Sequence, residues 1–235
     1  MEEMRLNKKL VELGVTSRRK ADEMIERGLV TVNNEVATLG TKVLDTDIIE
    51  VDGKVIKNDT SKIILMYYKE KGVICTESDA EKGIRISDKI KSFGFKKRLF
   101  TVGRLDKDTV GLIIITNDGD LSRDILNTKN NYEKEYEVIV NKEVNAEIKK
   151  GLEDGVFLKD LNKTTKKCKV KTNKDDKHKF NITITQGLNR QVRRMCEAFN
   201  LRVIKLKRVR IINLKLRDLK PGEFKVIKKK DIYGK

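Results

Sequence analysis

The chain has 235 residues, enough for one large or two modest domains that each bury a core. Its net charge of +17 is typical of a protein that binds a polyanion such as nucleic acid, and a basic protein without such a partner is the alternative. No run approaches the roughly 20 apolar residues of a membrane span and no signal peptide is predicted, so we expect a cytoplasmic protein with no membrane partner.

The residue types limit the chemistry that the chain can perform. Cys75, Cys168 and Cys196 are far apart and lack CxxC spacing, so we expect reduced thiols. His178 is the only histidine and stands in a polar stretch. A zinc site, a histidine general base and a cofactor are therefore not predicted. Any catalysis would depend on carboxylates, Tyr, Lys or Arg.

Residues 1–60 predict a small domain of two helices followed by β-hairpins. Leucines at helical spacing form the first helix, which ends at Gly14, and Thr16 or Ser17 caps a second helix that ends at Gly28. Two alternating segments follow, one around an Asn-Asn turn and one around an Asp-Gly turn. The cations of the helix pair could follow a phosphate backbone or form a solvated face. Those that we assign to RNA binding are Arg5, Lys8, Arg18, Arg19 and Lys20.

Residues 61–235 predict a second domain in which strands outnumber helices. A polar connector, residues 57–62, ends where this domain begins, and a long mixed sheet with few helices favours the α+β class. The predicted strands are residues 63–68, 99–103, 110–116, 134–140, 167–172, 179–185 and strand-rich 201–216. The predicted helices are residues 120–127, 145–155 and 189–200.

The stretch GRLDKDTVGLIIITNDGDL, residues 103–121, places four aspartates around an apolar run. The run from Val110 to Ile115 fits a buried strand, so the carboxylates before it stand at the edge of the core. Two interpretations are open at this point: a solvated turn between strands, or a rigid turn that holds one carboxylate as nucleophile or base. The four aspartates are Asp106, Asp108, Asp118 and Asp120.

Residues 5–37 resemble the S4 RNA-binding domain in their helix-turn-helix, the TSRRKAD opening of the second helix and the GLVTVNNE strand and turn. GRLD within residues 103–121 resembles the catalytic motif of the RsuA/RluB/RluE/RluF family of RNA pseudouridine synthases. EKEYEVIV at 133–140 is similar to that family's KEY motif, and residues 186–211 resemble its basic third motif. With TKKCKV at 165–170, these motifs are most similar to those of the RluF-like branch.

The resemblance implies an enzyme that isomerises a uridine in structured RNA without a metal or cofactor. The RluF-like branch acts on 23S ribosomal RNA; transfer RNA is open as a second substrate, and we expect a monomer. The implied fold is an S4-like domain at 1–60 followed by a catalytic domain at 61–235 with a mixed, largely antiparallel sheet.

The resemblance also implies roles for individual residues. Asp106 would be the nucleophile or base, Tyr136 would stack on the flipped uracil, and Arg193 would pair with Asp106 and keep it charged. On their own, Tyr136 would be interpreted as a packing residue and Arg193 as a surface cation. The cations expected to meet RNA are Arg104, Lys107, Arg190 and Arg194.

Two other functions are open from the sequence. One is a non-catalytic RNA-binding protein, and the other is a metal-dependent nuclease that uses the four aspartates of residues 103–121.

One departure from the family pattern is Glu70, which stands where relatives usually carry the proline of a Lys-Pro-x-Gly turn. We expect that loop to be less rigid as a result.

Overall fold

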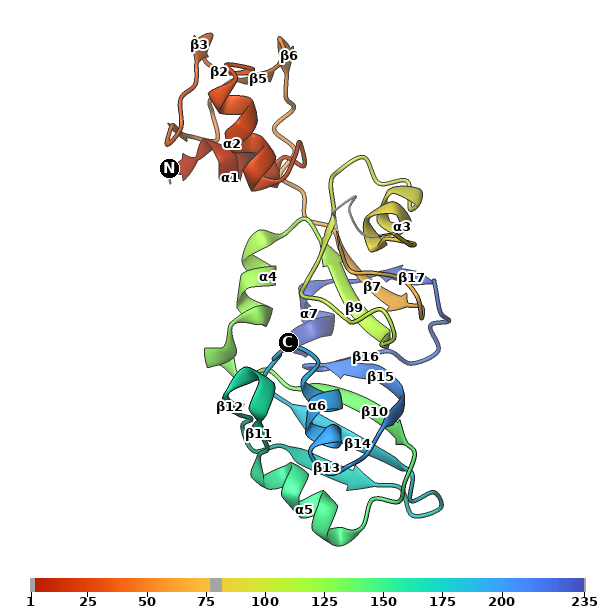
Figure 1. The fold of residues 1–235 in the computed structure, drawn as a ribbon. Coiled ribbons are helices and arrows are strands. Elements are labelled where there is room, and N and C mark those ends of the chain that lie inside the picture. The colour runs from red at the N-terminus through yellow and green to blue at the C-terminus, as the bar shows by residue number, and fades with distance from the viewer. Residues whose placement is uncertain (1–2, 77–81, 235) are drawn as a thin grey trace. The chain divides into compact units, whose positions relative to one another are not determined.

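The computed structural model describes residues 3–76 and 82–234, which divide into two compact units (Figure 1). The first unit contains the chain up to Ile63, Ile90–Phe100 and Thr116–Gly119, and the second contains the remainder. The first segment ends close to the boundary expected between residues 60 and 61. The two short later segments join the first unit by tertiary contacts, which a linear pattern does not reveal.

The first unit is a two-helix domain with short strands. α1 (Leu6–Glu12) ends just before Gly14, whose φ is +75°. Ser17 caps α2 (Arg18–Glu26), where its hydroxyl accepts a hydrogen bond from the Lys20 amide. The Asn-Asn and Asp-Gly turns both have positive φ at each residue, as two-residue hairpins require. The strands are β1 (Met4–Arg5), β2 (Val30–Val32), β3 (Glu35–Val36), β4 (Lys42–Val43), β5 (Ile49–Val51) and β6 (Lys54–Val55).

A mixed sheet is the frame of the second unit. Within the described residues nine strands join it, in the order β13-β14-β10-β15-β9-β7-β17, with β16 beside β15 and β8 beside β9. β15 runs antiparallel to β10 and parallel to β9, so the expected mixed, largely antiparallel sheet is confirmed. The strands are β7 (Ile64–Lys69), β8 (Phe100–Thr101), β9 (Val110–Thr116), β10 (Lys134–Val140), β13 (Lys169–Thr172), β14 (Lys179–Ile184), β15 (Val203–Ile211), β16 (Leu214–Lys215) and β17 (Phe224–Val226).

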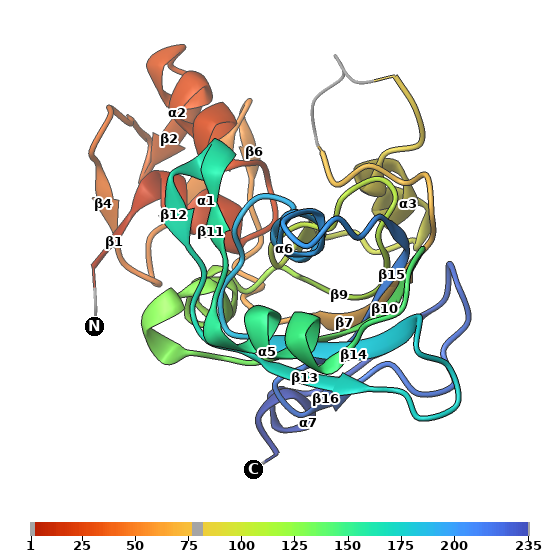
Figure 2. The ribbon, with the colours of Figure 1, turned by 60° about the horizontal axis from the view of Figure 1, so that its bottom comes forward.

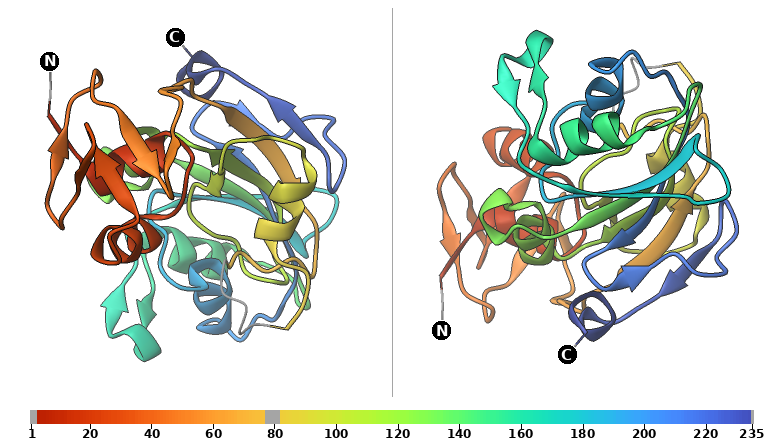
Figure 3. Two further views of the ribbon diagram at one scale, coloured as in Figure 1. Left: turned by 90° about the horizontal axis from the view of Figure 1, so that it is seen from above. Right: turned by 90° about the horizontal axis from the view of Figure 1, so that it is seen from below.

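Helices lie on both faces of this sheet. α5 (Ala146–Asp154) and α6 (Gln191–Glu197) cover one face, and α7 (Lys229–Tyr233) lies on the other (Figures 2 and 3). In the described part of the chain, no helix is long and apolar enough to cross a membrane. The remaining elements are α3 (Ile86–Ser92), α4 (Gly119–Leu126), β11 (Phe157–Leu158), β12 (Lys163–Thr164) and 3₁₀ turns at Thr128–Asn130 and Lys159–Leu161.

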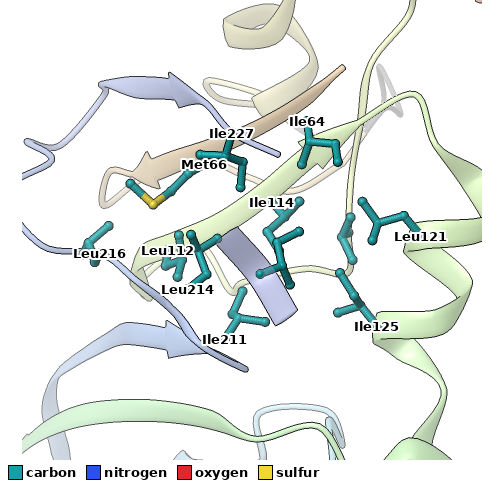
Figure 4. Close-up of a cluster of buried hydrophobic side chains, with 12 residues drawn as sticks. Ile64, Met66, Leu112, Ile114, Leu121, Ile125, Ile211, Leu214, Leu216 and Ile227 are labelled. Atoms are coloured by element: carbon teal, nitrogen blue, oxygen red, sulfur yellow. The ribbon is translucent and has the colours of Figure 1, made fainter. Parts of the chain in front are cut away.

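One buried apolar cluster joins strands β7, β9 and β15 to helices α4 and α7 (Figure 4). Leu112 and Ile114 of β9 lie at its centre and are completely buried, with Met66 of β7 and Ile232 of α7 among their neighbours in the cluster. Burying a side chain of this size stabilises a fold by about 1.5–3 kcal/mol. The cluster therefore fixes β9, and with it the turn that carries Asp106 just before the strand.

Gly111 decides how closely β9 and β15 approach each other. It is the register partner of Arg208, and a Cβ added to it would lie 2.3 Å from the Arg208 carbonyl oxygen. Its φ of +106° is also one that L side chains rarely adopt. Only glycine fits this contact, which brings β15 against the strand that follows the aspartate turn.

Candidate active site

An open cavity of about 490 Å³ lies in the second unit, within the size range of small-molecule sites. The turn before β9, the loop that leads into α6, and strands β10 and β15 contribute to its lining, and these elements meet at the α6 side of the sheet (Figure 2). The predicted site residues that line it are Arg104, Asp106, Lys107, Tyr136 and Arg190. Arg193 and Arg194 are not among its lining residues.

Asp106 stands on a turn that hydrogen bonds fix on several sides. Its carbonyl oxygen accepts from the Thr109 amide at 3.0 Å. Lys69 is completely buried and donates to the carbonyl oxygens of Thr109 at 2.8 Å and Lys107 at 3.4 Å. Burial lowers the pKa of Lys69. The Asp106 side chain is 31% exposed, so the rigid turn presents a carboxylate that a substrate can reach.

Arg190, and not the expected Arg193, is the ion-pair partner of Asp106 in the structure. Arg190 Nη1 lies 3.7 Å from Asp106 Oδ2. Arg190 is the N-cap of α6 and has a φ of +49°, a conformation that costs a non-glycine residue about 1–3 kcal/mol. Strain of this kind often accompanies a functional position, and here it accompanies the cation closest to the candidate carboxylate.

Arg193 instead binds the main chain of two segments outside α6. Its Nη2 donates to the Asp108 carbonyl oxygen at 3.3 Å, and its Nη1 donates to the Val203 carbonyl oxygen at 3.4 Å. The side chain is buried, and its Nε atom has no partner among the described residues. Because Arg193 stands inside the helix and packs between two backbone segments, it fastens the aspartate turn to β15 and does not meet the carboxylate.

Tyr136 is buried in β10, between Ile182 of β14 and Arg208 of β15. The register between β10 and β15 shifts between Glu135 and Tyr136, and bulges of this kind re-aim side chains next to active sites. The Arg208 guanidinium carbon lies 6.0 Å from the centre of the Tyr136 ring, and its Nη1 donates to the hydroxyl at 3.5 Å. Tyr136 therefore packs in the sheet and also lines the cavity.

Two further cations, Arg208 and Lys134, line the cavity and were not predicted. A period-two pattern could have found both, because side chains two residues apart on a strand share a face. Arg208 is in phase with buried Leu206, and Lys134 is in phase with Tyr136. Lys69, also missed, had a comparable signal, since it ends an otherwise apolar strand.

The cations expected to bind RNA occupy several surfaces. Arg104 and Lys107 are exposed where they line the cavity, whereas Arg194 is engaged by Asp160 in an ion pair. On the first unit Arg5, Arg18, Arg19 and Lys20 are exposed, and Lys8 is partly buried. Exposed cations of this kind can bind phosphates without reading bases.

The other aspartates of residues 103–121 have separate surroundings. The Asp118 amide donates to Thr116 Oγ1 at 3.0 Å, Asp120 pairs with Arg123 at 3.1 Å, and the Asp108 side chain is exposed. Across residues 3–76 and 82–234, no group of three or more His, Cys, Asp or Glu side chains is arranged to hold a metal ion. The donor set that the nuclease alternative requires is therefore not assembled by these aspartates.

Glu70, which replaces the family's usual proline, is anchored by side-chain contacts. The Tyr67 hydroxyl donates to its carboxylate, and Lys89 Nζ lies 3.0 Å from its Oε1. The pKa of Glu70 is lowered, since these hydrogen bonds outweigh the effect of burial, which raises it. An ion pair and a hydrogen bond thus fix the side chain of Glu70, at a position where a proline ring would restrict the backbone.

Comparison with known proteins shows to which family the chain belongs. Residues 63–198 match the profile of RNA pseudouridylate synthases, and residues 4–49 match that of the S4 domain. The chain belongs to the RNA pseudouridylate synthase family. This synthase is 43% identical over 225 residues to the dual-specificity RNA pseudouridine synthase RluF of Escherichia coli K12, covering 94% of this chain and 74% of that protein.

Two other relatives of the synthase agree. It is 38% identical to the ribosomal large subunit pseudouridine synthase B of Bacillus subtilis strain 168, over 93% of this chain and 90% of that one. A crystal structure of a pseudouridylate synthase matches with a TM-score of 0.69 at 27% identity, over 97% of this chain and 98% of that chain. The expected enzyme class, the S4 domain and the resemblance to RluF are confirmed.

Proposed function

We propose that this synthase isomerises a specific uridine of 23S ribosomal RNA and that Asp106 is its catalytic carboxylate. The observation that carries the proposal is the meeting of Asp106 and Tyr136 in one open cavity, with Arg190 3.7 Å from the carboxylate. Isomerisation breaks the bond between C1′ and N1 of the uridine, turns the base and joins C1′ to C5. The isomerisation involves no net oxidation or reduction, so carboxylate and aromatic side chains suffice to catalyse it.

Each residue then has a distinct role. Asp106 acts on the sugar or the base of a uridine taken out of its stack, and Arg190 positions that carboxylate. Tyr136 replaces the stacking that the flipped base gives up, an interaction worth about 1–3 kcal/mol. Arg104 and Lys107 bind phosphates at the cavity, since both are exposed cations in its lining.

The names of the relatives support a ribosomal substrate. The Bacillus subtilis relative is named for the large ribosomal subunit, and the Escherichia coli relative is named for dual specificity. We assign ribosomal RNA, the substrate class in the name of the Bacillus subtilis relative, to this chain as well. Transfer RNA is the second RNA to be tested. The S4 unit supplies binding to structured RNA through shape and phosphate position.

Replacing the candidate carboxylate tests the catalytic part. Asp106→Asn should abolish isomerisation of a 23S transcript while RNA affinity stays within a few-fold of wild type. Asp108→Asn is the matched control, because it removes a neighbouring exposed carboxylate outside the cavity lining and should remain active. Full isomerisation activity of Asp106→Asn would contradict this role, whereas RNA binding without isomerisation by the wild-type protein would favour a non-catalytic RNA-binding protein.

Mapping tests the substrate. Pseudouridines are compared in ribosomal and transfer RNA from cells with and without the gene, and one 23S site is expected to disappear. The purified protein should restore it on a transcript in excess chelator without shortening the chain. Loss of a site only in transfer RNA, or cleavage of the RNA, would exclude the proposal.

A further inference from the structure

A pair of cations lines the candidate uridine cavity without a carboxylate partner. Arg208 of β15 and Lys134 of β10 both line it near Tyr136: Arg208 is the register partner of the tyrosine, and Lys134 precedes it by two residues on β10. Among the ion pairs of the described residues, neither side chain has one with Asp or Glu, unlike Arg210 of the same strand, which pairs with Glu133 and Glu135. The cavity therefore contains positive charge that the protein itself leaves uncompensated.

Arg208 is the more deeply placed of the two. It is 4% exposed; its Nε donates to the Leu112 carbonyl oxygen at 2.7 Å and its Nη1 to the Tyr136 hydroxyl at 3.5 Å. Its Nη2 is buried and has no hydrogen-bond partner in the described part of the chain. A buried cation normally has a counter-charge and a full set of acceptors, because removing charge from water is costly.

Lys134 adds to the same positive field. Its Nζ donates only weakly, to the Tyr132 carbonyl oxygen at 3.4 Å. Burial lowers the pKa of Lys134, and the charge of Arg208 lowers it further, because the two cations repel each other. A negative group bound in the cavity that both line would relieve this repulsion.

The position of the pair indicates which part of the substrate supplies that charge. Phosphates of a large RNA are met by exposed cations, and Arg104, Lys107 and Arg190 provide these in the cavity lining. Arg208 and Lys134 instead neighbour the tyrosine that is proposed to stack on the base, one across the sheet and one along the strand. The base itself becomes negative during the reaction, because breaking the bond between C1′ and N1 leaves the bonding electrons on the uracil.

We propose that Arg208 and Lys134 stabilise the anionic uracil between bond cleavage and bond formation. The inference rests on the proposed function of the cavity. The bond pair of C1′–N1 passes to N1 and is delocalised onto the two carbonyl oxygens of the ring. After the base turns, C5 donates an electron pair to C1′, the C5 proton is lost, and N1 takes up a proton. The cations act most strongly while the base is detached, so they lower the barrier more than they tighten RNA binding.

Charge-removing variants test the proposal in single-turnover reactions of the full-length protein. Lys134→Met and Arg208→Met should slow product formation, the latter by about 10²–10³-fold as for loss of an electrostatic donor, with RNA affinity within a few-fold of wild type. Arg208→Lys should be slowed less than Arg208→Met. Lys205→Met is the control, because Lys205 is exposed on the same strand and outside the cavity lining, and it should react at the wild-type rate.

A substrate with a better leaving group separates electrostatic from structural effects. In RNA with 5-fluorouridine at the target, fluorine stabilises the uracil anion, so the slowing of C1′–N1 cleavage by each variant should shrink several-fold. Loss of the target nucleoside is followed on both substrates, because C5 of 5-fluorouridine carries fluorine in place of the proton that pseudouridine formation releases. Equal slowing on both substrates, unchanged rates in Lys134→Met, or weaker RNA affinity at an unchanged rate would overturn the inference. If Arg208→Met does not fold, Lys134→Met decides the question by the same criteria. Activity in Asp106→Asn would contradict the proposed function, whatever these cations do.

Discussion

At the scale of single residues, the site depends on which arginine meets the carboxylate. The two candidates stand three residues apart at the start of α6, and their surroundings differ. Arg190 is 42% exposed beside Asp106, whereas Arg193 is buried and donates only to carbonyl oxygens in the described structure. Charge at the first position acts on the proposed catalytic carboxylate, and charge at the second holds the backbone.

Substituting each arginine should therefore give different phenotypes. Arg190→Gln should reduce turnover by about 10–100-fold through misplacement of Asp106, with little change in the melting temperature. Arg193→Gln should lower the free energy of unfolding by about 1–3 kcal/mol, because buried carbonyl groups lose a charged donor. Turnover and thermal melting of both variants check this. A stable but inactive Arg193→Gln together with an active Arg190→Gln would reverse the assignment.

At the scale of elements, the close approach of β9 and β15 determines where the aspartate turn lies. Gly111→Ala should destabilise the protein by about 2 kcal/mol or more, because the Cβ would meet the Arg208 backbone and the φ of +106° is strained for alanine. Chemical denaturation measures the change. Gly53→Ala is a useful comparison, since its φ is also positive but no atom lies within 4 Å of the added Cβ. Equal destabilisation of both variants would show that backbone strain alone is responsible.

A second element-scale prediction concerns the ion cluster between β10 and β15. Hydrogen bonds from Lys169 and Arg210 lower the pKa of Glu133. Burial raises the pKa of Glu135, but hydrogen bonds from Arg210 and Asn181 lower it below its ordinary value of 4.5. As the pH decreases through 4.5, these two carboxylates bind more protons in the unfolded chain than in the folded one. The free energy of unfolding should therefore decrease as the pH decreases.

This acid sensitivity should depend on the guanidinium that both carboxylates share. In Arg210→Met the fall in the free energy of unfolding below pH 4.5 should be shallower, by about 1 kcal/mol at most for such partly exposed pairs. Denaturation curves between pH 3 and pH 7 measure it. Parallel curves for the variant and the wild type would show that the cluster contributes nothing to acid stability.

At the scale of the whole molecule, charge and a separate RNA-binding unit should set affinity independently of chemistry. The net charge of +17 predicts RNA binding that weakens steeply with salt. Replacing Arg18, Arg19 and Lys20 by Gln should weaken binding and reduce the slope of log affinity against log salt by about 0.7–0.9 for each phosphate that the protein no longer neutralises. The rate at saturating RNA should not change. A lower rate with an unchanged salt slope would place these cations outside the RNA interface.

Much of the fold followed from local pattern. The apolar run at β9, the alternation of β10 and the amphipathic α6 were predicted close to their observed bounds because each has a strong period and clear ends. The short elements α3, β11, β12, β17 and α7 were missed, since two to seven residues carry too little periodicity and depend on packing partners far along the chain.

The sequence by itself determined the enzyme family, the order of its parts and the identity of the candidate aspartate and tyrosine, because local motifs and composition carry that information. Only the tertiary structure decided that Arg190 meets Asp106, that Lys69 and Arg193 hold its turn, and that Arg208 contacts Tyr136 in a cavity that Lys134 also lines. These contacts join residues as many as 85 positions apart, as between Arg193 and Asp108. Their partners are selected by strand register and helix placement, which no linear spacing specifies.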